Sequence, residues 1–346
     1  MKRVTLGLDA VAAWDNLRLA ALKALRGKRA RPDARRFMYR LDARLHELRT
    51  QILAGTVTIG RSHQFTIHDP KERLITAPCF GERVLHHAIM NVCEPVFDRG
   101  LIADSYACRR GKGRIACLRR AQAIARCYPY FLKLDVRKYF DSINHQTLNE
   151  LLSRRFKNRG LLDLFGRIIA AHAASPGRGL PIGSLTSQHF ANFYLGGCDR
   201  YVKEVLRRSG YVRYMDDMAV WADSSDTLRR TLVDIRAFLD VRLGLAVKPD
   251  PYINRTRHGL DFLGCRVLPT HLVLSARSRR RYRRNLRAIE RAMARGEMSE
   301  AEVQRRGQAV VSFARAAGVK SWRFRRRTLD QLAGEGPGVG AGSPGR

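Results

Sequence analysis

The stretch YVRYMDDMAVW, residues 211–221, places two adjacent carboxylates between an aromatic-rich run and an apolar run. Its alternating pattern predicts a tight β-hairpin with Asp216 and Asp217 at the tip. Upstream, the apolar stretch FLKLD, residues 131–135, predicts a second strand that ends on Asp135. Because buried like charges are unfavourable without a cation, these three carboxylates predict a site for two divalent metal ions.

Two metal ions about 4 Å apart would neutralise the attacking and leaving oxygens of a phosphoryl transfer. Asp135 and Asp216 are the expected shared ligands. Asp217 is expected to play a supporting part, because a regular strand would point it to the opposite face. Lys248, just after the turn at residues 243–245, is a candidate acid for the leaving pyrophosphate, or else a solvated lysine.

The composition indicates a folded protein that binds a polyanion. The 346 residues carry 65 Lys and Arg against 31 Asp and Glu, a net charge of +34, and 45% of them are hydrophobic. The basic residues are spread along the whole chain, which disfavours a membrane-surface protein. No apolar run reaches the length of about 18 residues that a spanning helix needs, and the start lacks a signal-peptide pattern, so we expect an intracellular protein.

Neither a disulfide framework nor a zinc site is expected from the seven cysteines. Their number is odd, and no two of them form a Cys-x-x-Cys pair. Most are expected to be small buried hydrophobic residues.

The first part of the chain predicts basic amphipathic helices over residues 1–55, a hairpin over residues 65–75 with a turn at Asp69-Pro70, and a helix over 81–95. Lys71 and Arg73 have same-face spacing on that hairpin, so they are candidate contacts for a triphosphate or an ordinary charged surface. The stretch RRGKGR, residues 109–114, suits backbone approach to phosphates but matches no Walker or dinucleotide fingerprint. Its candidate nucleic-acid contacts are Arg109, Arg110 and Lys112.

The later part predicts a helix over 114–127, a strand over 130–136, helices over 145–174, 187–206 and 226–243, and a short strand near 246–247. A further hairpin is expected between residues 261–267 and 272–274. Residues 275–332 read as basic helices whose arginines, among them Arg277, Arg280 and Arg284, form either a solvated face or a clamp on a nucleic-acid backbone. The Gly/Pro-rich tail, 333–346, is expected to be disordered.

Seven sequence blocks in order resemble those of reverse transcriptases, over residues 60–275. They are RLI (73–75), SYACR (105–109), LD to FDSI (134–143), GLPIGS (179–184), SQ with AN (187–192), YMDD (214–217) and FLG (262–264). The resemblance implies an α+β right-hand polymerase fold and an RNA-directed DNA polymerase that uses two Mg²⁺ ions, with Mn²⁺ as an alternative. It implies a basic helical extension at 1–55, fingers at 56–130, a palm of antiparallel sheet and helices at 131–274 with fingers elements around 145–180, and a helical thumb at 275–332.

Carried over by position, the resemblance assigns roles to individual residues. It implies that metal ions bind Asp135, Asp216 and Asp217, and that Phe140 is a steric gate against a ribose 2′-hydroxyl. It implies that Lys71 and Arg73 hold the triphosphate of the incoming nucleotide, and that Ile182 and Gln188 form the wall near the nascent base pair. For Phe140 the alternative is a core aromatic beside Tyr139.

Within that family, IGSLTSQ (182–188) most resembles the enzymes of diversity-generating retroelements. Intron-type enzymes usually have Gln at the position of Ile182 and Pro at the position of Gln188. The resemblance implies careless copying of template adenines, mutagenic retrohoming, and a cytoplasmic, bacterial or phage-encoded protein. Its partners would be an RNA template, a DNA or RNA primer, dNTPs and a small basic accessory protein, with no membrane. The alternatives are an intron-like, retron or defence-associated reverse transcriptase and a non-catalytic RNA-binding protein.

Overall fold

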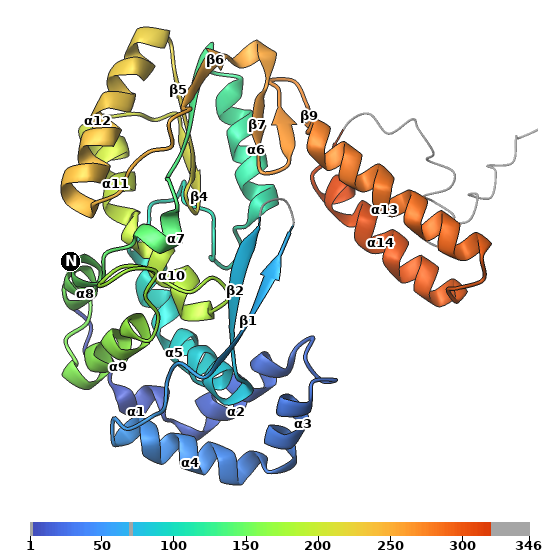
Figure 1. Ribbon diagram of the computed structural model, residues 1–346. Helices are drawn as coiled ribbons and strands as arrows, with labels where there is room; N and C mark the ends of the chain where they lie inside the picture. Colours follow the sequence, from blue (N-terminus) through green and yellow to red (C-terminus); the bar gives the residue numbers. More distant parts are fainter. Residues whose placement is uncertain (1–2, 69–71, 320–346) are drawn as a thin grey trace, which may run out of the picture.

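A computed structural model describes residues 3–68 and 72–319 (Figure 1). The helices expected near the start of the chain are present. They are α1 (Leu8–Val11), α2 (Trp14–Leu25), α3 (Pro32–Tyr39) and α4 (Leu41–Leu53). Helices α1, α2 and α3 pack on the long helix α5 (Phe80–Arg99), with α2 making the most extensive contact, and α4 packs on the other three, so these five helices form one end of the molecule (Figure 1).

A four-stranded antiparallel sheet forms the centre of the structure. Its order is β4-β5-β3-β6, with bounds β4 (Tyr211–Tyr214), β5 (Asp217–Ala222), β3 (Tyr130–Asp135) and β6 (Tyr252–Arg255). Alternate residues of β3 enter different cores, since Leu132 and Leu134 join one cluster and Phe131 joins another. The sheet is therefore covered on both faces, which explains why its strands read as nearly continuous apolar runs.

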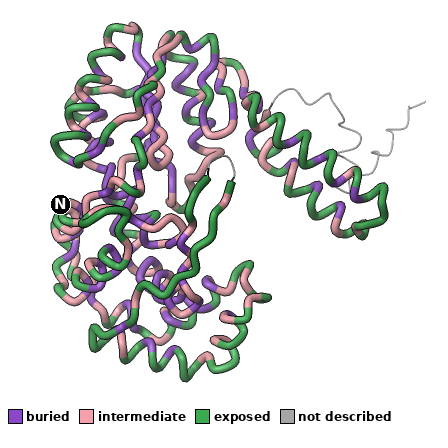
Figure 2. The backbone as a smooth tube through the Cα atoms, in the orientation of Figure 1, coloured by how far each residue is buried: buried purple, intermediate pink, exposed green. Residues whose placement is uncertain are grey.

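Different elements cover the two faces of this sheet. Helices α10 (Leu185–Tyr194) and α12 (Ser225–Leu243) contribute to the core that contains Leu132. Helix α6 (Arg114–Ala125) and the three-stranded sheet β7-β8-β9 contribute to the core that contains Phe131. Figure 2 shows the buried residues running through this central region and through the helical end.

The strand expected near residues 246–247 is only a single bridge, between Val136 and Val247. The regular pairing with β3 comes later, in β6, where Tyr252 lies opposite Lys133. The segment from 246 to 255 thus runs antiparallel along the whole of β3. This arrangement brings Lys248 beside the acidic end of β3.

Two smaller sheets flank the central one. Strands β1 (Ser62–Ile67) and β2 (Arg73–Pro78) form the expected hairpin, whose turn, with Lys71, lies outside the described residues. The expected hairpin over 261–274 is instead a three-stranded meander of β7 (Leu260–Phe262), β8 (Cys265–Val267) and β9 (Leu272–Leu274). The first segment turns on itself at Leu263 and Gly264, whose φ values are +48° and +81°.

Short helices connect these sheets. They are α7 (Tyr139–Ser142), α8 (His145–Ser153), α9 (Arg159–Ala170), α11 (Gly196–Arg200), a π-helical turn (Tyr201–Val205) and a 3₁₀ turn (Thr256–His258). Asn144 and Asn158 cap α8 and α9, because each side chain accepts a backbone N–H three residues ahead at 2.9 Å. The expected helical region over 145–174 is therefore two separately capped helices.

Helices α13 (Ala276–Ala294) and α14 (Glu300–Ala316) project from the rest of the molecule as a pair (Figure 1). They have a core of their own, which includes Tyr282, Leu286 and Val303. The guanidinium of Arg114 lies 3.4 Å from the ring centre of Phe313 and links the pair to α6. The remainder of the expected helical region and the tail, residues 320–346, lie outside the described residues.

A membrane-spanning segment was not expected. Within the described ranges, no helix has the length and the apolar character needed to cross a bilayer.

Candidate active site

The acidic tip of the β4–β5 hairpin lies against the end of β3. Tyr214 pairs with Asp217, so Met215 and Asp216 form a two-residue turn. Asp217 lies directly opposite Asp135 in the β3–β5 ladder, and residues directly opposite in an antiparallel ladder share a face. Asp217 was expected to point to the face opposite Asp216, because a regular strand was assumed to run through both residues. The turn at Met215 and Asp216 interrupts the strand, so this alternation of faces does not apply.

Burial and the repulsion between neighbouring carboxylates raise the pKa of both Asp216 and Asp217. Burial and the neighbouring Asp135 raise the pKa of Asp216 to about 7. Burial also raises the pKa of Asp217, although Lys133 opposes this change. The Oδ1 atom of Asp135 is buried and has no hydrogen-bond partner. A divalent cation would relieve the repulsion between Asp135 and Asp216 and would use this oxygen, so their donor set fits a hard metal ion.

The third carboxylate, that of Asp217, lies beside the side chain of a lysine. Nζ of Lys133 lies 3.3 Å from Oδ1 of Asp217. In the part of the chain that the structure describes, no three His, Cys, Asp or Glu side chains are arranged as a complete cation site. The three predicted ligands all lie close enough to repel one another, and the repulsion felt by Asp216 comes more from Asp135 than from Asp217.

Two lysines compensate the acidic charge. Lys248 forms an ion pair with Asp135, and its backbone N–H donates to the Asp135 carbonyl at 2.9 Å. Sequence analysis predicted Lys248 but missed Lys133. The signal was available, because Lys133 stands two residues before Asp135 and therefore on the same face of β3.

The raised pKa of Asp216 gives the metal-free protein a distinctive pH dependence. Its folded-state pKa of about 7 lies above the ordinary value of 3.8, so the folded state retains a proton that the unfolded state releases. This contribution to stability is fully present below pH 4 and is lost as the pH rises through 7. Between pH 5 and pH 8 we expect a loss on the order of 2 kcal/mol.

Urea unfolding with a chelator present, at pH 5 and pH 8, would measure this loss. The Asp216→Asn variant, which cannot titrate at this position, should lack it. Equal pH dependence in the two proteins would contradict the assignment. Adding Mg²⁺ should stabilise the wild-type protein more at pH 8 than at pH 5, because the ion binds the deprotonated carboxylate.

Backbone hydrogen bonds join the segments that carry the expected nucleotide contacts. The N–H of Thr76, in β2, donates to the carbonyl of Ile182 at 2.8 Å, and the N–H of Leu180 donates to the carbonyl of Phe140 at 2.9 Å. The Phe140 ring is half-buried and makes an edge contact with Tyr139, with 5.8 Å between ring centres. The structure therefore connects β2, the turn at 181–183 and α7.

Two of the other expected nucleotide contacts, Arg73 and Gln188, are exposed. Arg73 begins β2 opposite Ile67, and its side chain faces solvent. Gln188 lies in the first turn of α10, where Oε1 is 3.8 Å from the sulfur of Cys108. Lys71 lies outside the described residues, so its role stays a prediction.

Arg109 does not have the role that was predicted for it. Its side chain is only 9% exposed and forms an ion pair with Asp98. Its Nη1 donates to the carbonyls of Ile102 and Ser105 at 2.6 and 2.8 Å. The guanidinium therefore holds the loop together from inside and is not available to a phosphate.

The neighbouring residues Lys112 and Arg110 differ in how their side chains interact with the rest of the protein. Nζ of Lys112 donates to the carbonyl of Ala103 at 2.6 Å and lies 4.8 Å from the ring centre of Tyr106. Arg110 is exposed. Of the three basic side chains predicted in this loop, Arg110 is the one best placed to meet a nucleic acid.

The predicted arginines of α13 lie on its exposed side. Tyr282, Leu286 and Ile289 form the buried side of this helix, against α14. The side chains at helical spacing on the solvent side include the three that were predicted: Arg277, Arg280 and Arg284. This is the arrangement expected of a cationic face.

The family model for "Reverse transcriptase (RNA-dependent DNA polymerase)" matches residues 67–267, which is more than half of the chain. The chain belongs to the reverse transcriptase family. The matched region contains β3, the β4–β5 hairpin and all three carboxylates. This match confirms the expected family and the expected α+β right-hand polymerase fold.

Several individual proteins resemble this reverse transcriptase. A COX1/OXI3 intron 2 protein of Saccharomyces cerevisiae is 22% identical over 258 residues, which cover 55% of this chain and 30% of that protein. Protein YkfC of Escherichia coli is 24% identical over 207 residues, which cover 56% of this chain and 54% of YkfC. The chain therefore spans about half or less of the length of these curated relatives.

Among solved structures, the apo telomerase of Candida tropicalis matches with a TM-score of 0.46 and 13% identity. The match covers 79% of this chain and 62% of that one. A telomerase of Candida albicans in complex with a fragment of telomeric RNA matches with a TM-score of 0.45 and 12% identity. This match covers 63% of this chain and 45% of the telomerase chain.

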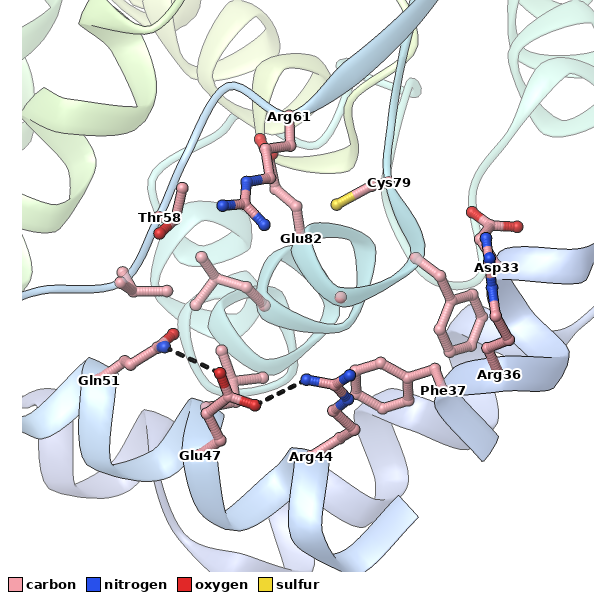
Figure 3. Close-up of a pocket in the computed structure, with 15 residues that line it drawn as sticks. Asp33, Arg36, Phe37, Arg44, Glu47, Gln51, Thr58, Arg61, Cys79 and Glu82 are labelled. Carbon is pink, nitrogen blue, oxygen red and sulfur yellow. Dashed lines mark hydrogen bonds and ion pairs between the residues drawn. The ribbon is translucent and has the colours of Figure 1, made fainter. Parts of the chain in front are cut away.

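The reverse transcriptase also has a cavity of about 510 Å³ outside the carboxylate site, between α3, α4 and the start of α5 (Figure 3). Arg44 and Gln51 reach Glu47 at 3.0 and 3.4 Å on its floor. Arg36 and Arg61 also line it. None of the predicted site residues contributes to this cavity, so we do not include it in the candidate active site.

Proposed function

We propose that this chain copies RNA into DNA by extending a DNA or RNA primer with dNTPs. The observation that carries the proposal is the half-buried acid pair of Asp135 and Asp216, formed where β3 ends and the β4–β5 hairpin turns, in a chain of the reverse transcriptase family. The net charge of +34 supports a nucleic-acid substrate, and binding should weaken steeply with salt.

Asp135 and Asp216 would hold two Mg²⁺ ions, with Asp217 as the supporting ligand and Mn²⁺ as the alternative metal. When bound, such ions neutralise charge at the attacking and leaving oxygens. Lys248 would donate a proton to the leaving pyrophosphate. Its ion pair with Asp135 supports this role, because it places the ammonium at the edge of the acidic site.

We propose the following division of the chain. Residues 1–55 form a basic helical extension, 56–130 the fingers, 131–274 the palm with fingers elements around 145–180, and 275–332 the thumb. The central sheet would be the palm platform, and the exposed arginines of α13 would track the template–primer backbone with little sequence readout.

Contacts to the incoming nucleotide would come from Lys71 and from β2, α7, the turn at 181–183 and α10. Arg73 and Lys71 would hold the triphosphate, Phe140 would exclude a ribose 2′-hydroxyl, and Ile182 and Gln188 would lie near the nascent base pair. The hydrogen bonds that join Thr76 to Ile182 and Leu180 to Phe140 support this grouping, because they tie β2, the turn at 181–183 and α7 together.

For the biological role we propose mutagenic retrohoming in a diversity-generating retroelement. The support is Ile182 and Gln188, at positions where intron-type enzymes usually have Gln and Pro. In that role the protein would be cytoplasmic, bacterial or phage-encoded, and would work with a small basic accessory protein. The second candidate is an intron-type reverse transcriptase, favoured by the similarity to the yeast intron protein.

Primer extension on an RNA template with Mg²⁺ and all four dNTPs, followed by sequencing of the cDNA, tests both levels of the proposal. Errors concentrated at template adenines would support the diversity-generating role. Accurate cDNA would favour the intron-type role, and absence of product both with and without candidate accessory proteins would favour a non-catalytic RNA-binding protein.

Replacing Ile182 with Gln should lower misincorporation opposite template adenine by about tenfold, because a polar contact at the base pair would add roughly 1.4 kcal/mol of discrimination. The matched control is Ile182→Val, which keeps an apolar side chain and should leave the error spectrum unchanged. Sequenced cDNA from the three proteins on one template makes the comparison. Identical adenine errors in Ile182→Gln and wild type would argue against this placement.

A further inference from the structure

Arg213 is a fully buried charged residue that stands three positions before Asp216. All five N–H donors of its guanidinium are used. Nε and Nη2 donate to the two carboxylate oxygens of Asp199 at 2.6 and 2.5 Å. The remaining donors reach both oxygens of Asn192, at 2.8 and 3.1 Å, and the carbonyl of Met215 at 2.9 Å. A guanidinium with every donor paired has a single orientation.

The hydrogen bond from Arg213 to the carbonyl of Met215 holds the turn that carries Asp216. Met215 has a φ of +56°, a left-handed conformation that a residue with a side chain seldom adopts without support. Its carbonyl belongs to the peptide group that joins it to Asp216. Because that peptide group is planar, fixing the carbonyl also fixes the direction in which the chain enters Asp216.

The two residues whose side chains accept hydrogen bonds from Arg213 are themselves held by further hydrogen bonds. Asp199 is fully buried and also accepts the hydroxyl of Tyr211 at 2.7 Å. Asn192 is buried and donates through Nδ2 to the carbonyl of Ala107 at 2.8 Å. The guanidinium therefore connects the turn to α10, to α11 and, through Asn192, to the loop that precedes α6.

We propose that Arg213, held by Asp199 and Asn192, is a positioning residue for Asp216: it orients the Met215–Asp216 peptide so that the Asp216 carboxylate faces Asp135 and, with it, binds divalent metal. This inference rests on the proposed function. Arg213 is fully buried and all its donors are paired within the protein, so it acts through the turn.

A merely structural role would make a different prediction. A buried ion pair that only stabilised the fold would, when weakened, lower the melting temperature and leave the metal affinity of the folded protein unchanged. A positioning role predicts weaker metal binding in protein that is still folded. The two roles are therefore separated by metal affinity measured below the melting temperature.

The test is Mn²⁺ binding to the purified full chain, followed by the electron paramagnetic resonance signal of free Mn²⁺, without nucleic acid or dNTP. Arg213→Lys keeps the positive charge but lacks the planar fork that reaches Asp199 and Met215 together. We expect it to bind Mn²⁺ about 10- to 100-fold more weakly than wild type, the loss typical of residues that orient metal ligands. In primer extension, kcat should fall while the KM for dNTP stays unchanged.

Arg109→Lys is the matched control, because it alters another nearly buried guanidinium, one paired with Asp98 and without contact to the turn. It should lower the melting temperature and leave Mn²⁺ affinity at the wild-type value. If Arg213→Lys does not fold, Asn192→Ser removes one acceptor from the same network and should weaken Mn²⁺ binding to a smaller extent. Wild-type Mn²⁺ affinity in whichever of these two variants folds would overturn the positioning role.

Asp216→Asn separates this inference from the proposed function. If Asp216→Asn loses Mn²⁺ binding and Arg213→Lys does not, the metal site stands and the positioning role fails. If Asp216→Asn binds Mn²⁺ as tightly as wild type, the metal assignment itself fails, whatever Arg213→Lys does.

Discussion

The Asp216→Ala variant is expected to lose DNA synthesis by at least about a thousandfold and to retain RNA binding. The carboxylate of Asp216 lies beside that of Asp135, and burial raises its pKa to about 7. Removing it takes away one of the two side chains that would share the metal ions, so charge at the reacting oxygens is no longer neutralised. Primer extension and RNA binding by filter retention, at one salt concentration, measure the two quantities.

The control for this variant is Asp223→Ala, since Asp223 is an exposed carboxylate just after β5. It should leave both synthesis and RNA binding at wild-type levels. Substantial polymerisation by Asp216→Ala would refute the metal assignment. Loss of RNA binding together with synthesis would indicate that the hairpin had unfolded, and circular dichroism would detect that.

Replacing Phe140 with Ala should allow the enzyme to incorporate ribonucleotides. The aromatic face of Phe140 would contact the sugar of the incoming nucleotide and leave no room for a 2′-hydroxyl. Without it, the ratio of kcat/KM for dNTP to kcat/KM for NTP should fall by about a hundredfold, equivalent to roughly 3 kcal/mol of discrimination. Single-nucleotide extension with matched dNTP and NTP measures this ratio.

A purely structural Phe140 would behave differently. Its half-buried ring packs against Tyr139 and the main core, so its removal should also lower stability. Phe238→Ala is the control, because Phe238 stacks on Tyr201 at 4.7 Å and lies on α12. If both variants lose stability and neither changes the sugar preference, Phe140 is a core residue and not a gate.

Three of the four strands of the central sheet could be predicted from simple sequence patterns. Alternation in residues 211–221 indicated the hairpin of β4 and β5, and the apolar stretch at 131–135 indicated β3; the acids at their ends are brought together as expected. The face of Asp217 was harder to predict, because it depends on the two residues that make the turn. A shift of one residue in a turn exchanges the faces of everything that follows.

The roles of basic residues in loops were harder to predict from the sequence. Arg109 and Arg110 are adjacent and chemically identical, yet one is inside the loop and the other is exposed. Composition cannot distinguish them, since the choice depends on Asp98, eleven residues upstream. Likewise, the fourth strand was expected near 246–247 but lies at 252–255, because pairing with β3 and not local β-propensity selects it.

The order of strands in the central sheet also determines when the active site can form during synthesis of the protein. Strand β3 pairs on one side with β5 and on the other with β6, so its partners follow it by more than 80 and more than 110 residues. Helices α1 to α5 can pack together once residue 99 has left the ribosome. By contrast, Asp135 acquires its neighbours on both sides only after residue 255 has emerged. Until then at least one edge of β3 lacks its partner strand and presents unpaired backbone N–H and C=O groups, which exposes the nascent chain to aggregation and to chaperones.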